Sequence, residues 1–77
     1  MKTLDEFVAL FAEQLDETDP STVTAETKFR ELDEWSSLLA LTLISMIDEE
    51  FDVVLKGDDV KNSETIEDVY NIVVSKI

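Results

Sequence analysis

Residues 36–51, "SSLLALTLISMIDEEF", form the most apolar stretch of this 77-residue chain and decide its fold class. Successive residues of a helix lie about 100° apart around its axis, so apolar residues three and four positions apart share one face. We therefore predict a helix from about Ser36 to Glu50. One side of this helix is apolar and should face the core, with two further apolar residues at the edge of that side. The core face holds Ala40, Leu43, Ile44, Ile47 and Phe51, and the flank holds Leu39 and Met46.

The opposite side of this predicted helix is apolar at its start and acidic at its end. It carries Leu38, Leu41, Thr42, Ser45, Asp48 and Glu49. The two leucines have two interpretations: they pack beneath the preceding loop, or they are exposed. Scattered exposed leucines are ordinary in folded proteins. We favour a partner-docking patch of Leu38, Leu41, Asp48 and Glu49, a small apolar contact bordered by negative charge.

Two adjacent serines open the helix, and they suit different roles. Ser36 is placed to act as the N-cap, because its hydroxyl can accept a hydrogen bond from a first-turn backbone N–H. Ser37 then lies at the first helical position, where the dipole and the free N–H groups favour negative charge. A phosphate ester on Ser37 would be well placed there. The alternative, that both serines only support the helix start, stays open on these residues alone.

The segments on either side of this helix predict two further helices. The first runs from about Thr3 to Leu15, because apolar residues recur in it at helical spacing. The last begins near residues 63–65 and runs to about Lys76, with Thr65 and Asp68 forming a capping box at its start. The apolar stripe of the first helix is Leu4, Phe7, Val8, Phe11 and Leu15, and that of the last is Ile66, Val69, Tyr70, Val73 and Ile77.

The remaining segments are connections. Residues 16–35 form a long loop in which Pro20 and Ser21 break any helix, and loops of this length in small domains are often functional. Residues 51–56 predict an extended connector, and residues 57–64 hold one short helical turn. We expect four spaced apolar residues to anchor the loop to the core: Val23, Phe29, Leu32 and Trp35. The sum is an all-α fold, a small antiparallel four-helix bundle with three main helices and one short one, in a single domain of residues 1–77.

The chain is strongly acidic and lacks two of the side chains most used in catalysis and metal binding. It has 19 Asp and Glu against 6 Lys and Arg, a formal net charge of −13, no Cys and no His. This charge argues against nucleic acid and anionic membranes as partners, and favours proteins with basic patches. Disulfides, thiolate metal sites and a Ser-His-Asp triad are excluded within the chain. We predict no catalytic residue and no metal ligand. We expect the protein in the cytoplasm, because no signal-peptide or membrane-spanning pattern stands out. We also expect it to be a monomer.

The segment "FRELDEWSSLLALTLISMIDEEFDVVL", residues 29–55, resembles the centre of acyl carrier proteins. In that family an Asp-Ser-Leu motif opens the second helix, and an acidic "EEF" run closes it. Here Ser37 and Leu38 match the Ser-Leu step, and the closing run follows at the family's spacing. The other matching parts are "DEEFDVVL" at 48–55, "NSETIEDVYNIV" at 62–73, and the apolar residues Phe29 and Leu32 before the motif.

The resemblance implies that Ser37 receives a 4′-phosphopantetheine arm from coenzyme A, added by a separate Mg²⁺-dependent phosphopantetheinyl transferase. The thiol of the arm then carries acyl groups as thioesters, for fatty acid, polyketide or related biosynthesis. The chain would be a substrate of that transferase and of acyl-processing enzymes with basic docking patches, and not itself an enzyme. An apolar interior would either shelter the acyl chain, as in the family, or form a plain packed core. Its residues are Leu43, Ile44, Ile47, Val69, Tyr70 and Val73.

Two positions depart from the family pattern. Ser36 stands where the family has Asp, which keeps the helix cap but removes one negative charge beside Ser37. Thr42 stands where the family often has an acid on its docking face. Two alternatives remain. The first is an aminoacyl, peptidyl or other specialised carrier, and the second, which Ser36 in place of Asp favours, is an unmodified carrier-like interaction module.

Overall fold

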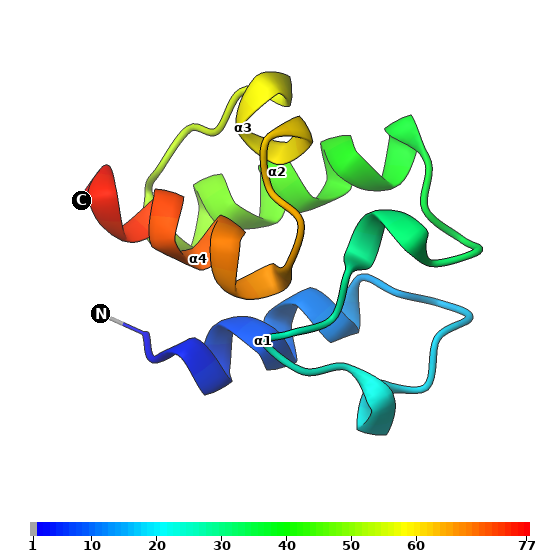
Figure 1. Cartoon of the computed structure of the whole chain (residues 1–77). Helices are drawn as coiled ribbons and strands as arrows, with labels where there is room; N and C mark the ends of the chain where they lie inside the picture. Colours follow the sequence, from blue (N-terminus) through cyan, green and yellow to red (C-terminus); the bar gives the residue numbers. More distant parts are fainter. Residues whose placement is uncertain (1) are drawn as a thin grey trace.

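The longest helix, α2, runs from Ser37 to Phe51 in the computed structural model, which describes residues 2–77 (Figure 1). Those residues form helices and turns and contain no strand. The other elements are α1 (Leu4–Glu13), α3 (Gly57–Lys61), α4 (Ile66–Ser75) and two 3₁₀ turns between α1 and α2, η1 (Pro20–Thr22) and η2 (Phe29–Glu31). The predicted small helical bundle is confirmed, with three longer helices and one short one.

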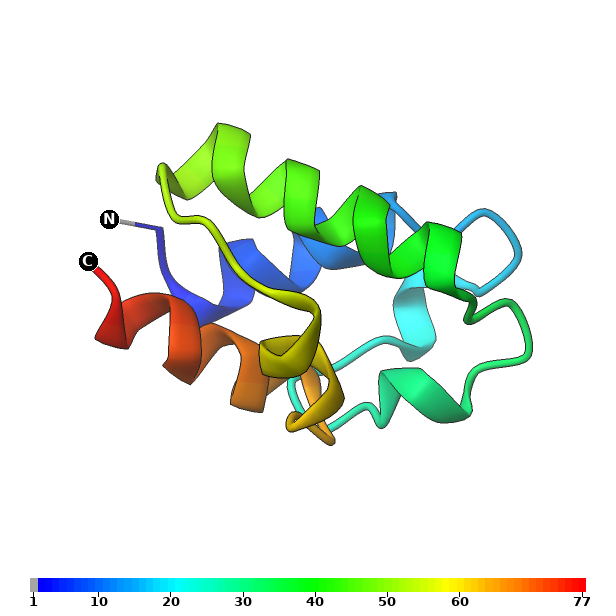
Figure 2. The ribbon, with the colours of Figure 1, turned by 90° about the horizontal axis from the view of Figure 1, so that it is seen from above.

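The path of the chain places the start of α2 away from the start of α1 and from the end of α4 (Figures 1 and 2). Followed by colour in Figures 1 and 2, α1 runs antiparallel to α2 and α4, while α2 and α4 run in the same general direction. α1 lies against α4, and α3 contacts both α2 and α4. The start of α1 and the end of α4 therefore meet at one end of the molecule. The start of α2 lies at the other end, beside the long loop.

Phenylalanine side chains hold the helices together. Phe7 of α1 is fully buried, and its ring centroid lies 5.5 Å from that of Phe51 in α2 and 5.4 Å from that of Tyr70 in α4. Burial of a large apolar side chain stabilises a fold by roughly 1.5–3 kcal/mol, and an aromatic pair adds about 0.5–1.5 kcal/mol. The largest fully buried apolar side chains are Phe7, Phe11, Phe29, Ile47, Ile66 and Val73.

Each main helix begins at a hydroxyl cap. Thr3 and Glu6 form a capping box at α1, Ser36 caps α2, and Thr65 and Asp68 form the predicted capping box at α4. Such caps satisfy first-turn N–H groups that have no partner within the helix. The predicted starts of these helices are therefore confirmed to within a few residues.

α2 ends at a residue in the left-handed conformation. Asp52 has φ 56° and ψ 40°, and its N–H donates to the carbonyl of Asp48 at 3.0 Å. A left-handed residue after the last turn terminates many helices, most often as Gly and less often as a polar residue. Residues 52–56 after it have no regular secondary structure and lead into α3. The predicted connector is therefore confirmed except at Phe51, which is the last residue of α2, and α3 is the short helical turn predicted within residues 57–64.

The structure corrects three details of the apolar stripes. Ile77 is 66% exposed, because α4 ends at Ser75, so its place on the inner stripe was wrong. Met46 was placed on the flank of α2 but is buried in the core. α1 ends at Glu13, two residues before the predicted end, although Leu15 remains buried.

The long loop is fixed to the fold at several points. Val23 and Phe29 are buried, and the ring of Trp35 packs on that of Phe29 with centroids 4.9 Å apart. The loop carbonyl of Thr27 accepts a hydrogen bond from Ile66 N at 3.2 Å, and Arg30 Nε donates to the carbonyl of Ser63 at 2.9 Å. The predicted anchoring of this loop is confirmed, since Leu32 and Trp35 also pack against the buried cluster.

Candidate functional site

The start of α2 assigns different positions to the two serines. Ser36 has an extended backbone, with φ −154° and ψ 169°, and its Oγ accepts a hydrogen bond from Leu39 N at 3.2 Å. Ser37 is the first helical residue, and it is exposed. The predicted cap is therefore confirmed at Ser36, and the Ser37 hydroxyl lies at a solvent-accessible helix start.

The first turn of α2 carries no acidic residue, although 19 of the 77 residues are Asp or Glu. The first N–H groups of any α-helix lack partners within the helix. Here the Leu39 N–H donates a hydrogen bond to the Ser36 hydroxyl oxygen. An N-terminus of this kind carries a partial positive charge, which an anion nearby stabilises. The site therefore suits a negatively charged group on Ser37.

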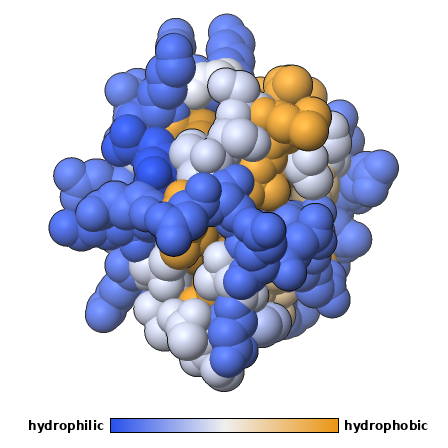
Figure 3. All heavy atoms as spheres, turned by 90° about the vertical axis from the view of Figure 1, so that its right-hand side faces the viewer, coloured by the Kyte–Doolittle hydropathy of each residue, from blue (hydrophilic) through white to orange (hydrophobic). Residues whose placement is uncertain are grey.

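Two leucines beside Ser37 face solvent. Leu38 is 74% exposed and Leu41 is 61% exposed, so the interpretation that they pack beneath the loop was wrong. Asp48 and Glu49 are exposed further along the same helix. Figure 3 views the molecule from the side on which the loop and the start of α2 lie, and it shows apolar surface among strongly hydrophilic surface. All residues of the predicted docking patch are thus accessible.

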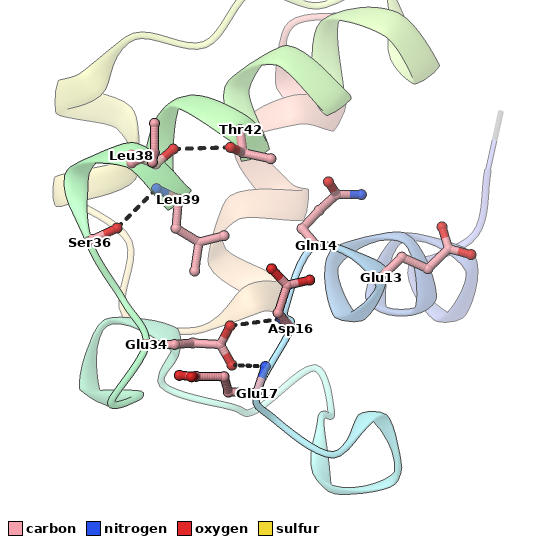
Figure 4. Close-up of a pocket in the computed structure, with 9 residues that line it drawn as sticks. All are labelled: Glu13, Gln14, Asp16, Glu17, Glu34, Ser36, Leu38, Leu39 and Thr42. Carbon is pink, nitrogen blue, oxygen red and sulfur yellow. Dashed lines mark hydrogen bonds between the residues drawn. The ribbon is translucent and has the colours of Figure 1, made fainter.

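An open hollow of about 430 Å³ lies beside Ser36, between the end of α1 and the start of α2 (Figure 4). Polar groups on its walls already bond within the chain: Thr42 Oγ1 donates to the carbonyl of Leu38 at 3.1 Å, and Gln14 Nε2 donates to that of Leu10 at 3.2 Å. The hollow is lined by Glu13, Gln14, Asp16, Glu17, Glu34, Ser36, Leu38, Leu39 and Thr42.

Glu34 connects two distant segments at the edge of this hollow. Its Oε1 accepts from Asp16 N at 2.9 Å, and its Oε2 accepts from Glu17 N at 3.1 Å (Figure 4). Oε2 also accepts from the Thr18 hydroxyl. The Thr18 hydroxyl, with the two backbone N–H groups, holds the pKa of Glu34 below its ordinary value of 4.5. The sequence did not single out Glu34, because one acid in an acidic loop carries no periodic signal.

The predicted apolar interior is a packed part of the core. Leu43, Ile47, Val69 and Val73 are buried together, while Ile44 and Tyr70 are half-buried against them. The Tyr70 hydroxyl donates to the carbonyl of Lys2 at 3.0 Å. α2 and α4 therefore supply the side chains that the sequence predicted for this interior.

No helix among residues 2–77 is long and apolar enough to cross a membrane.

Comparisons with known proteins agree with these features. The family described as "Phosphopantetheine attachment site" matches residues 5–73. A protein of Kocuria rhizophila named "Acyl carrier protein" is 32% identical over 76 residues, which cover 95% of this chain and 94% of that relative. The match includes the start of α2, the long loop before it and most of α4.

Proposed function

This chain belongs to the acyl carrier protein family, and we propose that it carries acyl groups on a 4′-phosphopantetheine arm attached to Ser37. The observation that carries the proposal is the exposed Ser37 at the first position of α2, in a first turn without acids. The thiol of the arm supplies the thioester chemistry that a chain without Cys does not have. The chain itself would act as a carrier and as a substrate of other enzymes.

Ser37 is favoured over Ser36 because the two hydroxyls are differently engaged. Ser36 Oγ accepts the hydrogen bond that caps α2, and a bulky ester on that oxygen would disturb it. Loss of a cap bond costs about 1 kcal/mol. Ser37 lies inside the helix, so an ester on its oxygen leaves the cap in place.

Attachment would be a phosphoryl transfer that the chain assists only by position. The Ser37 hydroxyl oxygen forms a bond to the phosphorus that bears the pantetheine group of coenzyme A. The pyrophosphate P–O bond breaks, and adenosine 3′,5′-bisphosphate leaves. The hydroxyl proton passes to a base of the transferase, whose Mg²⁺ offsets the charge of the phosphates. The resulting phosphodiester anion lies at the α2 N-terminus, which stabilises a nearby negative charge by about 0.3–1 kcal/mol.

The docking patch beside Ser37 supports recognition by partner enzymes. Leu38 and Leu41 would fill a small apolar pocket, while Asp48 and Glu49 would meet basic residues around it. The net charge of −13 would speed encounter with such basic surfaces, an effect that added salt weakens. We propose that the partners are a phosphopantetheinyl transferase and acyl-processing enzymes, with the carrier acting as a cytoplasmic monomer.

The proposed cargo is an acyl intermediate of fatty acid, polyketide or related biosynthesis. An aminoacyl or peptidyl carrier is the second candidate, because the same arm on Ser37 would carry either kind of thioester. Thr42, which stands where the family often has an acid, indicates partner enzymes that differ from those of housekeeping fatty acid synthesis. Loading assays separate the two. An acyltransferase that charges the arm supports the first candidate, and an adenylating enzyme that charges it with an amino acid supports the second.

The attachment itself is tested by intact mass after incubation with coenzyme A, Mg²⁺ and a broad-specificity phosphopantetheinyl transferase. The wild type and Ser36→Ala should gain the mass of one phosphopantetheine group, and Ser37→Ala should gain none. No gain on the folded wild type would contradict the proposal and favour an unmodified interaction module. A gain of mass on Ser37→Ala but not on Ser36→Ala would show that the group is attached to Ser36, which would contradict the assignment to Ser37.

A further inference from the structure

The Glu34 carboxylate joins the segment after α1 to the segment before α2. Its three hydrogen-bond donors lie 16–18 residues earlier in the chain, at Asp16, Glu17 and Thr18. Glu34 itself is two residues before the Ser36 cap and three before Ser37. One side chain therefore closes the loop that leads to the proposed attachment site.

The same short segment is held from its other side by the core. Trp35 packs its ring on the buried Phe29, and Trp35 N donates to the carbonyl of Leu32 at 3.0 Å. Glu34 thus fixes the solvent side of the segment and Trp35 fixes the core side. The backbone that enters α2 at Ser36 is therefore held by contacts on both sides.

The charges around Glu34 indicate that its position needs these bonds. Glu13, Asp16 and Glu17 line the same hollow, and the chain already has a large negative charge. Like charges at short range repel, so an unbonded glutamate would be favoured further out in solvent. Hydrogen bonds to an ionised acceptor are the stronger kind, and three of them offset this repulsion.

We propose that Glu34 is a positioning residue for Ser37, which holds the entry to α2 in the orientation that the transferase binds. The inference rests on the proposed attachment at Ser37. Without the Glu34 bonds, the entry segment would sample several orientations, and only a fraction of them would fit the transferase. Apparent affinity falls in proportion to that fraction, while the bound complex reacts as before. The expected signature is therefore a raised KM for the carrier with an unchanged kcat.

The test compares variants that differ in one feature each. Glu34→Gln removes the charge and one of the two accepting oxygens, and Asp33→Asn removes the same charge one residue earlier on an exposed side chain. Thr18→Val removes a single donor without changing charge, and Thr18→Ser restores it. Two readouts are measured: the hydrogen exchange of the Asp16 and Glu17 amides by NMR, and KM and kcat for phosphopantetheine transfer.

For Glu34→Gln we expect amide exchange and KM each to rise about fivefold to tenfold, with kcat within about twofold of the wild type. Thr18→Val should raise amide exchange and KM by a smaller factor. Thr18→Ser and Asp33→Asn should have the wild-type values of both. Unchanged exchange in Glu34→Gln would overturn the inference, and so would faster exchange with an unchanged KM. A wild type that gains no phosphopantetheine would instead overturn the proposed function, which separates the two failures.

Discussion

The starts of α2 and α4 have the same kind of cap but opposite surroundings. In α4, Thr65 Oγ1 accepts from Asp68 N at 3.2 Å, and the Asp68 carboxylate accepts from Thr65 N at 3.1 Å and from Glu64 N at 3.0 Å. The loop carbonyls of Thr27 and Ala25 accept from the next two N–H groups, those of Ile66 and Glu67, at 3.2 Å and 2.9 Å. In α2, Ser36 supplies one cap bond at 3.2 Å, and the first turn holds Ser37 and two leucines instead of acids.

If Ser37 is the attachment site, as we propose, this difference separates a helix start built for stability from one left open to a covalent group. The chain itself satisfies the N–H groups of α4, and Glu67 and Asp68 complement its dipole. α1 and α3 also have acids in the first turn, so α2 alone among the four helices of residues 2–77 lacks them. An anion on Ser37 would supply at α2 the negative charge that side chains supply elsewhere.

The largest expected effect comes from making the start of α2 resemble that of α4. Leu38→Glu places a carboxylate in the first turn, where it would repel the phosphates of coenzyme A. Two like charges about 5 Å apart cost roughly 1–3 kcal/mol at a partly hydrated surface. We expect kcat/KM for phosphopantetheine transfer to fall by about tenfold or more relative to Leu38→Gln, which makes the same change of shape without the charge. Equal rates for the two variants would show that the missing acid does not matter.

The caps themselves should show the next largest effect, in stability. Thr65→Ala removes a cap that lies within a network of bonds, and Ser36→Ala removes the single side-chain bond at α2. Measured by urea denaturation, the free energy of unfolding should fall by about 1–2 kcal/mol in Thr65→Ala and by about 0.5–1 kcal/mol in Ser36→Ala. Ser36→Asp should restore the α2 cap. A greater loss from Ser36→Ala than from Thr65→Ala would reverse the comparison.

A smaller effect is expected from pH at the α4 start. Backbone N–H groups of Thr65 and Glu64 donate to Asp68 and hold its pKa below the ordinary value of 3.8. Because the folded pKa is the lower one, the stabilisation is complete above 3.8 and is lost as pH falls through the folded value. The Tm of Asp68→Asn should therefore be below that of the wild type at neutral pH and converge with it in acid.

Two controls define that result. Glu67→Gln removes a charge from the same turn, and its effect on Tm should be smaller. Asp68→Asn should leave transfer to Ser37 unchanged, because α4 begins outside the proposed attachment site. A gap in Tm between wild type and Asp68→Asn that persists in strong acid would contradict the assigned role of the carboxylate.

The smallest and least local effect is expected from salt. With 19 acids against 6 bases, self-repulsion lowers stability at low ionic strength, and screening should reduce it. The ion pairs between Lys2 and Glu50, at 3.6 Å, and between Lys76 and Asp59, at 3.9 Å, are partly exposed and oppose this trend only weakly. Tm should rise from low to moderate salt, by about 4–8 °C for each kcal/mol gained. A constant Tm would count against strong self-repulsion.

Local patterns in the sequence were enough to predict the helices and their caps. Ser36 and the pair of Thr65 and Asp68 act within one turn, so residue type and spacing are sufficient to identify them. The buried face of α2 was predicted only in part. Leu43 and Ile47 are buried as predicted, Ala40, Ile44 and Phe51 are half-buried, and Met46, at the edge of the apolar stripe, is buried instead. Ile77 was misplaced because periodicity does not mark where the last turn of a helix unwinds.

What the sequence did not reveal depends on contacts between distant segments. The bonds of Glu34 to residues 16–18 and the bond of Arg30 to the Ser63 carbonyl join residues far apart in the chain. No periodic pattern records such pairs. The exposure of Leu38 likewise depended on the path of the loop, and both alternatives were compatible with the sequence.

The most direct test of the attachment at Ser37 is the mass of the protein isolated from its native cells, with fragmentation to locate any modification. We predict a chain heavier by one phosphopantetheine group, with or without an acyl cargo, and fragments that place the group on Ser37. A native protein that binds a partner but has the mass of the bare chain would contradict the account, as would fragments that place the group on Ser36.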